Sequence, residues 1–113
     1  MAGRFQVYEV AMEMALALRP VLETLKRSDR SLEDQMRRAA ASVVLNIAEG
    51  AQRSGKDRLQ HYRIAAGSAA EVRSALGLAK AWGYLEVADL EAVDVLLDRV
   101  LAMLWRLTHG RSP

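Results

Sequence analysis

The chain has 113 residues, 51% of them hydrophobic, and a formal net charge of +2, which predicts a single domain over residues 1–113 with a buried core. It has no cysteine, which excludes disulfides, thiolate metal sites and a cysteine nucleophile. The N-terminus lacks a signal-peptide pattern and no window holds the roughly 18 consecutive apolar residues of a membrane span, so we expect a cytoplasmic protein without a membrane segment.

The first predicted helix runs from about residue 5 to residue 26. Alanine, leucine and arginine are abundant, which favours helix along nearly the whole chain. Pro20 lies inside the helical pattern, and we expect it to kink the helix without ending it. Two apolar lines run along this helix, a main seam at steps of four and three (Val7, Ala11, Met14, Leu18, Val21 and Leu25) and a second line beside it (Tyr8, Met12 and Leu16).

Two capping patterns mark the starts of the next helices. Ser31 and Asp34 have the spacing of a capping box, which predicts a second helix from about residue 31 to residue 53. Ser54 and Asp57 repeat this spacing, which predicts a third helix from about residue 57 to residue 82, ended by Gly83.

The last helix is predicted to begin near residue 87 or 88. Its seam is the most regular in the chain and is formed by Leu90, Val93, Leu97, Val100, Leu104 and Leu107. Because short connections make consecutive helices antiparallel neighbours, the sequence predicts an all-α fold, an antiparallel up-down-up-down four-helix bundle.

A line of polar residues runs along one side of the second predicted helix, because such residues recur at steps of four, four and three from Arg38 to Glu49. If the second and third helices fold back about residue 54, Arg38 faces Glu71, Ser42 faces Gly67 and Ser68, and Glu49 lies near His61. Gly67 is expected to let the helices approach closely. We predict a structural polar network with a partly buried Arg38–Glu71 ion pair; its members are Arg38, Ser42, Asn46, Glu49, Ser68 and Glu71. Such a network can fix helix register or line a ligand groove, and both interpretations stay open.

Residues 32–50, LEDQMRRAAASVVLNIAEG, resemble the signature of the four-helix bundle proteins encoded in 23S rRNA intervening sequences. That signature reads approximately L-x-x-Q-x-R-R-A-x-x-S-[IV]-x-x-N-I-A-E-G. Residues 62–71 are similar to a second element of the family, I-A-x-G-S-x-x-E. The resemblance implies the same fold and ring-shaped homopentamers. The chain also resembles the related accessory variability determinants of diversity-generating retroelements, which are basic rings that bind nucleic acid and a reverse transcriptase.

Positive charge is concentrated in the central part of the sequence, where residues 26–63 hold nine Lys/Arg and five Asp/Glu. Repeated around an oligomer, a basic patch at the turn near residue 54 would present a multivalent surface to phosphates. The candidate contacts are Arg37, Arg53, Lys56, Arg58, His61 and Arg63. Because no aromatic residue other than Tyr62 lies within this patch, we expect salt-dependent binding of RNA or DNA with little sequence preference.

Apolar residues outside the main seams predict a homo-oligomer, by resemblance a pentamer. They are the second line of the first helix and, in the last helix, Leu96, Met103 and Trp105.

No catalytic, metal or cofactor site is expected. His61 and His109 are far apart in sequence, and neither a Glu-x-x-His pair nor a glycine-rich phosphate loop is present. The sequence therefore predicts a non-enzymatic adapter that binds nucleic acid. The alternative is a protein-interaction scaffold that does not bind nucleic acid, with a protein as its partner.

Overall fold

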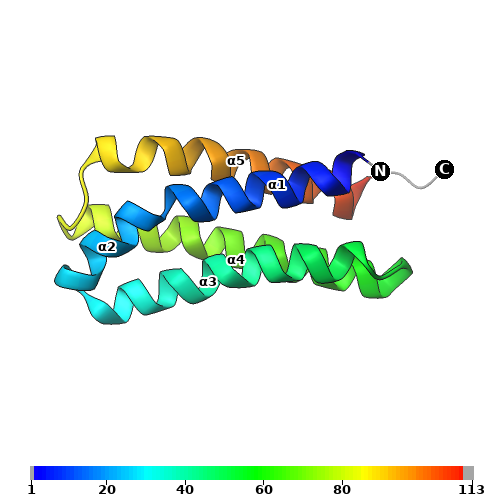
Figure 1. Cartoon of the computed structure of the whole chain (residues 1–113), viewed down its shortest axis with the longest axis horizontal. Helices are drawn as coiled ribbons and strands as arrows, with labels where there is room; N and C mark the ends of the chain where they lie inside the picture. The colour runs from blue at the N-terminus through cyan, green and yellow to red at the C-terminus, as the bar shows by residue number, and fades with distance from the viewer. Residues whose placement is uncertain (1, 111–113) are drawn as a thin grey trace.

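The fold is all-α, as the sequence predicted. The computed structural model describes residues 2–110, which contain five helices and no strand: α1 (Ala2–Ala17), α2 (Arg19–Ser28), α3 (Arg30–Ala51), α4 (Gly55–Ala81) and α5 (Val87–His109). Figure 1 shows α1 and α2 following one another along one path, with α3, α4 and α5 beside them. The molecule is elongated, with extents of 47 × 22 × 19 Å. Five helices are found instead of the four predicted because the first predicted helix is divided.

The division lies at the expected kink. Leu18 keeps helical backbone angles, and its N–H still donates to the Met14 carbonyl at 3.0 Å. Pro20, one of the first residues of α2, has no N–H and cannot bond the carbonyl of Leu16 one turn earlier. The Leu22 N–H restores the helical pattern by donating to the Leu18 carbonyl at 2.8 Å. The chain therefore bends between α1 and α2 and stays helical on both sides (Figure 1).

The start of α3 is capped by Asp29, and the prediction of Ser31 as the cap was wrong. Asp29 has extended backbone (φ −160°, ψ 92°), and its side chain accepts a hydrogen bond from the Leu32 N–H at 3.0 Å. Ser31 lies inside the first turn of α3. Aspartate and serine are both favoured caps, so the sequence pattern could not decide between two neighbouring candidates.

The other helix ends are partly as predicted. Ser54 stands at the cap position of α4, but its side chain makes no capping hydrogen bond, so the expected Ser54–Asp57 box is not formed. Gly83 ends α4 as predicted, with φ at 79°, a conformation that favours glycine. Its N–H donates to Lys80 at 3.0 Å and the Tyr84 N–H donates to Ala79 at 2.9 Å, the two bonds of a Schellman motif.

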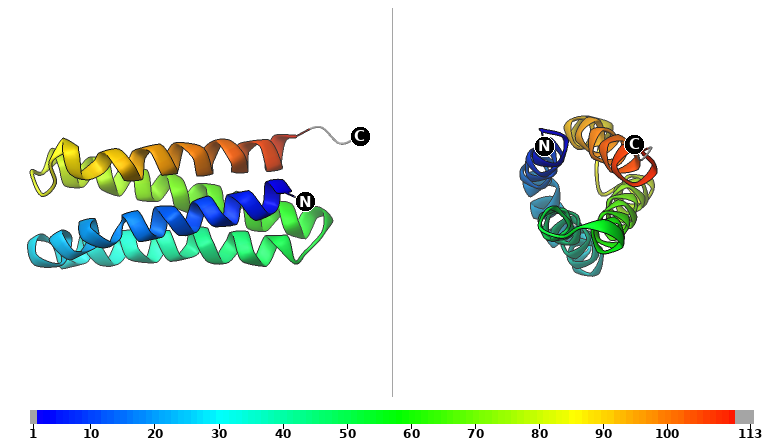
Figure 2. Two further views of the ribbon diagram at one scale, coloured as in Figure 1. Left: turned by 45° about the horizontal axis from the view of Figure 1, so that its top comes forward. Right: turned by 90° about the vertical axis from the view of Figure 1, so that its right-hand side faces the viewer.

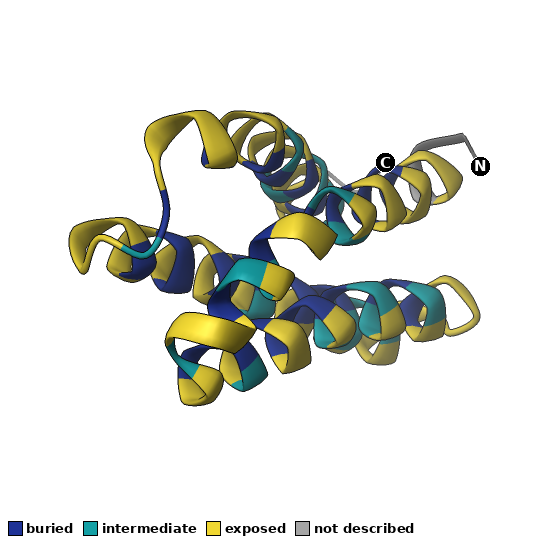
Figure 3. Ribbon diagram, turned by 60° about the vertical axis from the view of Figure 1, so that its left-hand side comes forward, coloured by how far each residue is buried: buried dark blue, intermediate teal, exposed yellow. Residues whose placement is uncertain are grey.

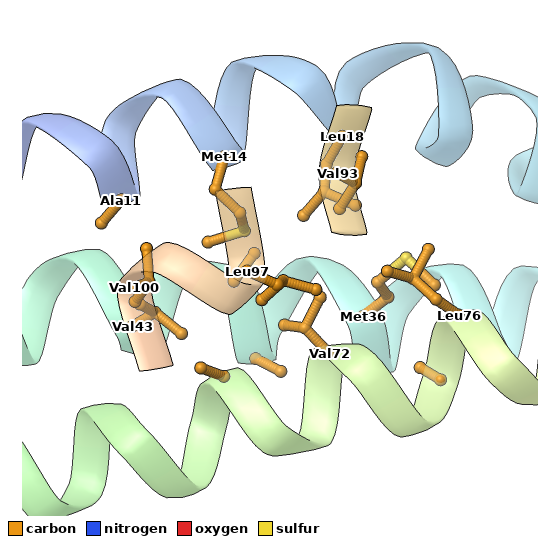
Figure 4. Packing of buried hydrophobic residues seen from close by; sticks show 14 of the residues in the cluster. Ala11, Met14, Leu18, Met36, Val43, Val72, Leu76, Val93, Leu97 and Val100 are labelled. Atoms are coloured by element: carbon orange, nitrogen blue, oxygen red, sulfur yellow. The ribbon is translucent and has the colours of Figure 1, made fainter. Parts of the chain in front are cut away.

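Both predicted seams form the core. All six seam residues of the first predicted helix are buried, and in α5 the seam is buried from Leu90 to Leu104, with Leu107 partly buried. Figure 3 shows buried residues following the inner side of each helix. In Figure 4, Leu18 lies beside Val93, and Met14 points toward Leu97, which lies against Val72. Small buried residues of α3 and α4 let these helices pack closely; they include Ala39, Ala65 and Ala69.

Candidate nucleic-acid interface

The short connection between α3 and α4 gathers basic residues from both helices. We call this region, residues 49–63, the tip. It lies at the same end of the molecule as the N-terminus and the end of α5 (Figure 2). Gly55 has φ at 59°, which favours glycine at this turn. Arg53, Lys56 and Arg58 all lie in or next to this turn, so the predicted basic patch lies at this end of the molecule.

Arg53 is surrounded by carboxylates. Its guanidinium donates to Glu49 Oε2 at 2.7 Å and to Asp57 Oδ2 at 2.9 Å. These interactions raise the pKa of Arg53, the hydrogen bond to Glu49 most strongly, followed by that to Asp57. Because both partners carry negative charge, Arg53 adds less positive potential to the tip than its sequence position suggests.

The remaining cations of the tip differ in their surroundings. The Nε of Arg58 donates to the carbonyl of Gly50 at 3.3 Å, at the C-terminal end of α3, where a cation is favoured by the helix dipole. Lys56 and Arg63 are exposed and make no ion pair with any residue that the structure describes. These two side chains are therefore the members of the tip most available to a phosphate.

Arg37 does not join the tip. Arg53 follows the end of α3, and the 14 residues from Arg37 to the last residue of α3, Ala51, correspond to about 21 Å of helical rise. The Nε of Arg37 donates to Glu33 at 3.3 Å, and Arg37 also pairs with Asp34. The prediction that Arg37 extends the basic patch from the outer face is therefore wrong in its geometry.

His61 turns toward α3 and belongs to the polar network. Its Nδ1 lies 3.0 Å from Asn46 Oδ1, and the side chain is partly buried. The Asn46 amide also donates to the carbonyl of Ser42 at 3.0 Å and to its Oγ at 3.2 Å. Ser42 Oγ is 2.7 Å from Ser68 Oγ across the two helices. The predicted Ser42–Ser68 contact is confirmed, and His61 faces Asn46 and not Glu49, about one turn from the expected register.

The predicted Arg38–Glu71 ion pair is wrong. The Arg38 side chain is 73% exposed, and its Nε lies 3.6 Å from Asp34 Oδ2 in the same helix. Glu71 is also exposed and lines a shallow pocket of about 200 Å³ with Gln35 and Ser74. Glu49 likewise bonds Arg53 and not the network. Charged groups remain in water unless the site compensates their desolvation, and the α3–α4 contact closes with small hydroxyl and amide groups instead.

Removing either charge should therefore have little effect on stability. Arg38→Ala and Glu71→Ala are each expected to change the free energy of unfolding by less than about 0.5 kcal/mol, because exposed charges contribute little. Urea denaturation at one fixed protein concentration checks this. A loss of about 3 kcal/mol or more, as for a broken buried pair, would contradict the exposed arrangement.

The close approach of α3 and α4 depends on Gly50 and not on Gly67. A Cβ at Gly50 would lie 2.7 Å from Tyr62 Cε1, whereas a Cβ at Gly67 would meet no atom within 4 Å. Gly67 lies on the exposed side of α4, so its predicted role was wrong. The sequence signal that could have indicated this contact is the combination of Gly50 near the end of α3 with the bulky Tyr62 in the first turns of α4.

An apolar face covers α1 and the adjacent side of α3. Its large exposed members are Tyr8, Met12 and Leu45, with Leu45 65% exposed. Between the helices lies a groove of about 330 Å³, lined by Met12, Ala15, Leu18, Leu22, Arg37, Ala40, Ala41, Val44 and Leu45. Leu16, 63% exposed, lines a different groove with Leu85, Ala88 and Ala92. The second apolar line predicted for the first helix is thus exposed in the single chain. In α5, Leu96 and Met103 pack partly against the core, while Trp105 is 60% exposed.

Two other features were outside the sequence-based site. The rings of Trp105 and His109 are stacked, with centroids 4.6 Å apart and planes 9° apart. The four-residue spacing of these residues in a helix could have indicated the contact. At the opposite end, the Tyr84 hydroxyl donates to Asp29 Oδ2 at 3.3 Å and joins the α4–α5 loop to the α2–α3 turn.

Within residues 2–110, no group of three or more His, Asp or Glu side chains is placed to hold a metal ion. In the same part of the chain, no helix combines the length and the apolar character needed to cross a membrane.

Comparison with known proteins gives a family and a fold. The family described as 23S rRNA-intervening sequence protein matches residues 3–106. No curated protein matches the chain. The crystal structure of a protein of unknown function from the S23 ribosomal protein family of Bacteroides thetaiotaomicron has a TM-score of 0.82. That chain is 20% identical, and the alignment covers 90% of this chain and 97% of the other, so the likeness shows a shared fold.

Proposed function

Since the chain belongs to the family of 23S rRNA-intervening sequence proteins, we propose that it is a non-enzymatic, homo-oligomeric adapter that binds nucleic acid through the tip. In this proposal α1 and α2 act as one kinked element, which makes the chain an antiparallel up-down-up-down four-helix bundle. The observation that carries the proposal is the exposure of Lys56 and Arg63 without ion pairs in the described part of the chain.

The charge at the tip supports phosphate binding, which by itself carries little sequence preference. Four Lys/Arg side chains lie there: Arg53, Lys56, Arg58 and Arg63. The acidic neighbours of Arg53 offset part of this charge, so one copy of the tip is a weak electrostatic site. Repetition in an oligomer raises the affinity for a polyanion because later contacts become intramolecular.

The apolar face supports assembly. Large apolar side chains that stay exposed together commonly mark interfaces between subunits. On α1 and α3 these side chains flank a groove whose lining is apolar except for Arg37. We propose that this face is covered by another copy of the chain, and the family resemblance favours a ring of five.

The same groove favours a second candidate, a protein-interaction scaffold. In that case the apolar face binds a different protein, and the basic residues of the tip serve mainly to keep the molecule in solution. The two candidates differ in one property, because only the adapter requires nucleic-acid binding.

A binding titration with a matched control separates them. Fluorescent structured RNA and duplex DNA are titrated with the wild type, with Lys56→Glu/Arg63→Glu, and with Lys26→Glu/Lys80→Glu, which has the same charge change at exposed positions of the opposite end. The adapter predicts binding at low salt and a loss of at least about tenfold in affinity for the tip variant only. Absence of wild-type binding at low salt, or equal losses in both variants, would contradict it.

A further inference from the structure

Trp105 presents a large aromatic surface to solvent near the end of α5. Its side chain is 60% exposed although its neighbours Leu104 and Val100 are fully buried. One side of the indole is covered by the parallel ring of His109. The His109 ring is held in turn, because its Nδ1 lies 3.1 Å from the carbonyl of Trp105 and 3.0 Å from Thr108 Oγ1. The two rings therefore form a fixed, partly exposed stack.

The stack lies next to the tip. The ion pair between Arg73 and Asp98 shows which turns of α4 and α5 lie side by side in their antiparallel packing. Seven residues further along α5 is Trp105, and seven residues back along α4 is Ala66, so Trp105 lies beside the turn of α4 that carries Arg63. Figure 2 shows the end of α5 beside the start of α4 at the same end of the molecule. From Ala66 to Gly55 the helix rises by roughly 16 Å, a short path along the exposed cations.

Positive charge accompanies the aromatic surface along this path. Arg63 and Lys56 are exposed on α4, and Arg106 is exposed on α5 directly after Trp105. No ion pair engages any of the three within residues 2–110. An exposed aromatic ring flanked by cations is the arrangement that binds single-stranded nucleic acid, because bases stack on the ring while phosphates contact the cations.

We propose that the Trp105–His109 stack is a binding site for an unpaired nucleobase, so that the preferred ligand of the tip is single-stranded nucleic acid. This inference rests on the proposed function and specifies the ligand class of that surface. A paired base in a duplex has its faces covered by its neighbours, and only an unstacked base can extend the Trp105–His109 stack.

The chain offers a matched control because it has two tryptophans, Trp82 directly after α4 and Trp105 near the end of α5. Trp82 is 57% exposed, close to the value for Trp105, but it contacts Tyr84 edge-on at 6.0 Å between ring centroids and lies at the end opposite the tip. Trp82→Phe leaves Trp105 as the only indole, and Trp105→Phe leaves Trp82. Each variant therefore reports fluorescence from one end of the molecule.

The experiment titrates both single-tryptophan variants with a single-stranded DNA, a single-stranded RNA and a DNA duplex, at low salt. Quenching of Trp105 by both single strands, without quenching of Trp82, is the expected result. Trp105→Ala should weaken single-strand binding about 5- to 100-fold, as for the loss of one stacked base, while Trp82→Ala and duplex binding change little. Quenching by RNA alone or DNA alone would identify which nucleic acid supplies the base.

Two results would overturn the inference in different ways. If single strands bind but Trp105→Ala retains the wild-type affinity, or both tryptophans are quenched equally, the stacking site is wrong while the proposed function stands. If no nucleic acid binds the wild type at low salt, the proposed function fails and the stacking site fails with it.

Discussion

Gly50→Ala is expected to lower the free energy of unfolding by about 1–3 kcal/mol, even though alanine is the better helix former. The new Cβ would lie 2.7 Å from Tyr62 Cε1, 2.9 Å from Tyr62 Cδ1 and 3.2 Å from His61 Cβ. Tyr62 is 1% exposed and cannot swing into solvent, and His61 is held by Asn46. The added methyl group therefore forces α3 and α4 apart where they pack most closely. Urea denaturation measures the loss.

Gly67→Ala is the control, and its expected effect on the free energy of unfolding has the opposite sign. Gly67 is also in a helix interior, but no atom lies within 4 Å of an added Cβ. Alanine should therefore stabilise the protein by about 0.5–1 kcal/mol through helix propensity alone. If Gly50→Ala were as stabilising as Gly67→Ala, the contact between Gly50 and Tyr62 would be wrong. Both variants are compared at one protein concentration, because assembly shifts apparent stability.

Asp29→Ala is expected to destabilise the protein by about 2 kcal/mol, since one carboxylate serves two contacts. Oδ1 accepts from the Leu32 N–H at the start of α3, and Oδ2 accepts from the Tyr84 hydroxyl. Thermal or urea denaturation measures the loss. Tyr84→Phe removes only the second contact and should cost less than Asp29→Ala. Equal losses in the two variants would show that the cap contributes nothing.

The carboxylate of Asp29 should also affect the pKa of Tyr84. Burial raises the pKa of the Tyr84 phenol, and the charge of Asp29 and the hydrogen bond to it raise the pKa further. Because the raised pKa belongs to the folded state, the stabilisation is fully present below pH about 10 and is lost as the pH rises through the folded pKa. Asp29→Asn should lower the pKa of Tyr84, so that its phenolate absorbance appears at a lower pH than in the wild type. The titration of Tyr84→Phe gives the absorbance of the other tyrosines, which is subtracted.

The helical architecture could be predicted because it depends on periodicity. The seams from Val7 to Leu25 and from Leu90 to Leu104 are buried as the spacing indicated, and Gly83 ends α4. Caps were less predictable, since Asp29 and Ser31 are both suitable residues and only the extended backbone at Asp29 distinguishes them. The division of the first predicted helix follows from the missing N–H of Pro20, and the sequence could predict this bend.

The polar contacts between α3 and α4 were predicted only in part. The spacing correctly paired Ser42 with Ser68, because the helix register places these two short side chains on facing turns. It did not predict how far the long side chains of Arg38 and Glu71 would extend. Such side chains reach water with little cost, and Arg38 instead contacts Asp34 on its own helix. The stack of Trp105 and His109 was missed because the two residues were considered separately.

The dependence of binding on salt tests the adapter proposal most directly. Each phosphate contact released by salt contributes about 0.9 to the slope of log affinity against log salt for duplex DNA. One copy offers five cations at this surface, Arg53, Lys56, Arg58, Arg63 and the neighbouring Arg106, so a single copy cannot give a slope steeper than about −4.5. An assembled adapter predicts a steeper slope, which becomes shallower in Lys56→Glu/Arg63→Glu. An affinity that does not change with salt would contradict phosphate binding at the tip, and a slope shallower than about −4.5 would contradict its repetition in an oligomer.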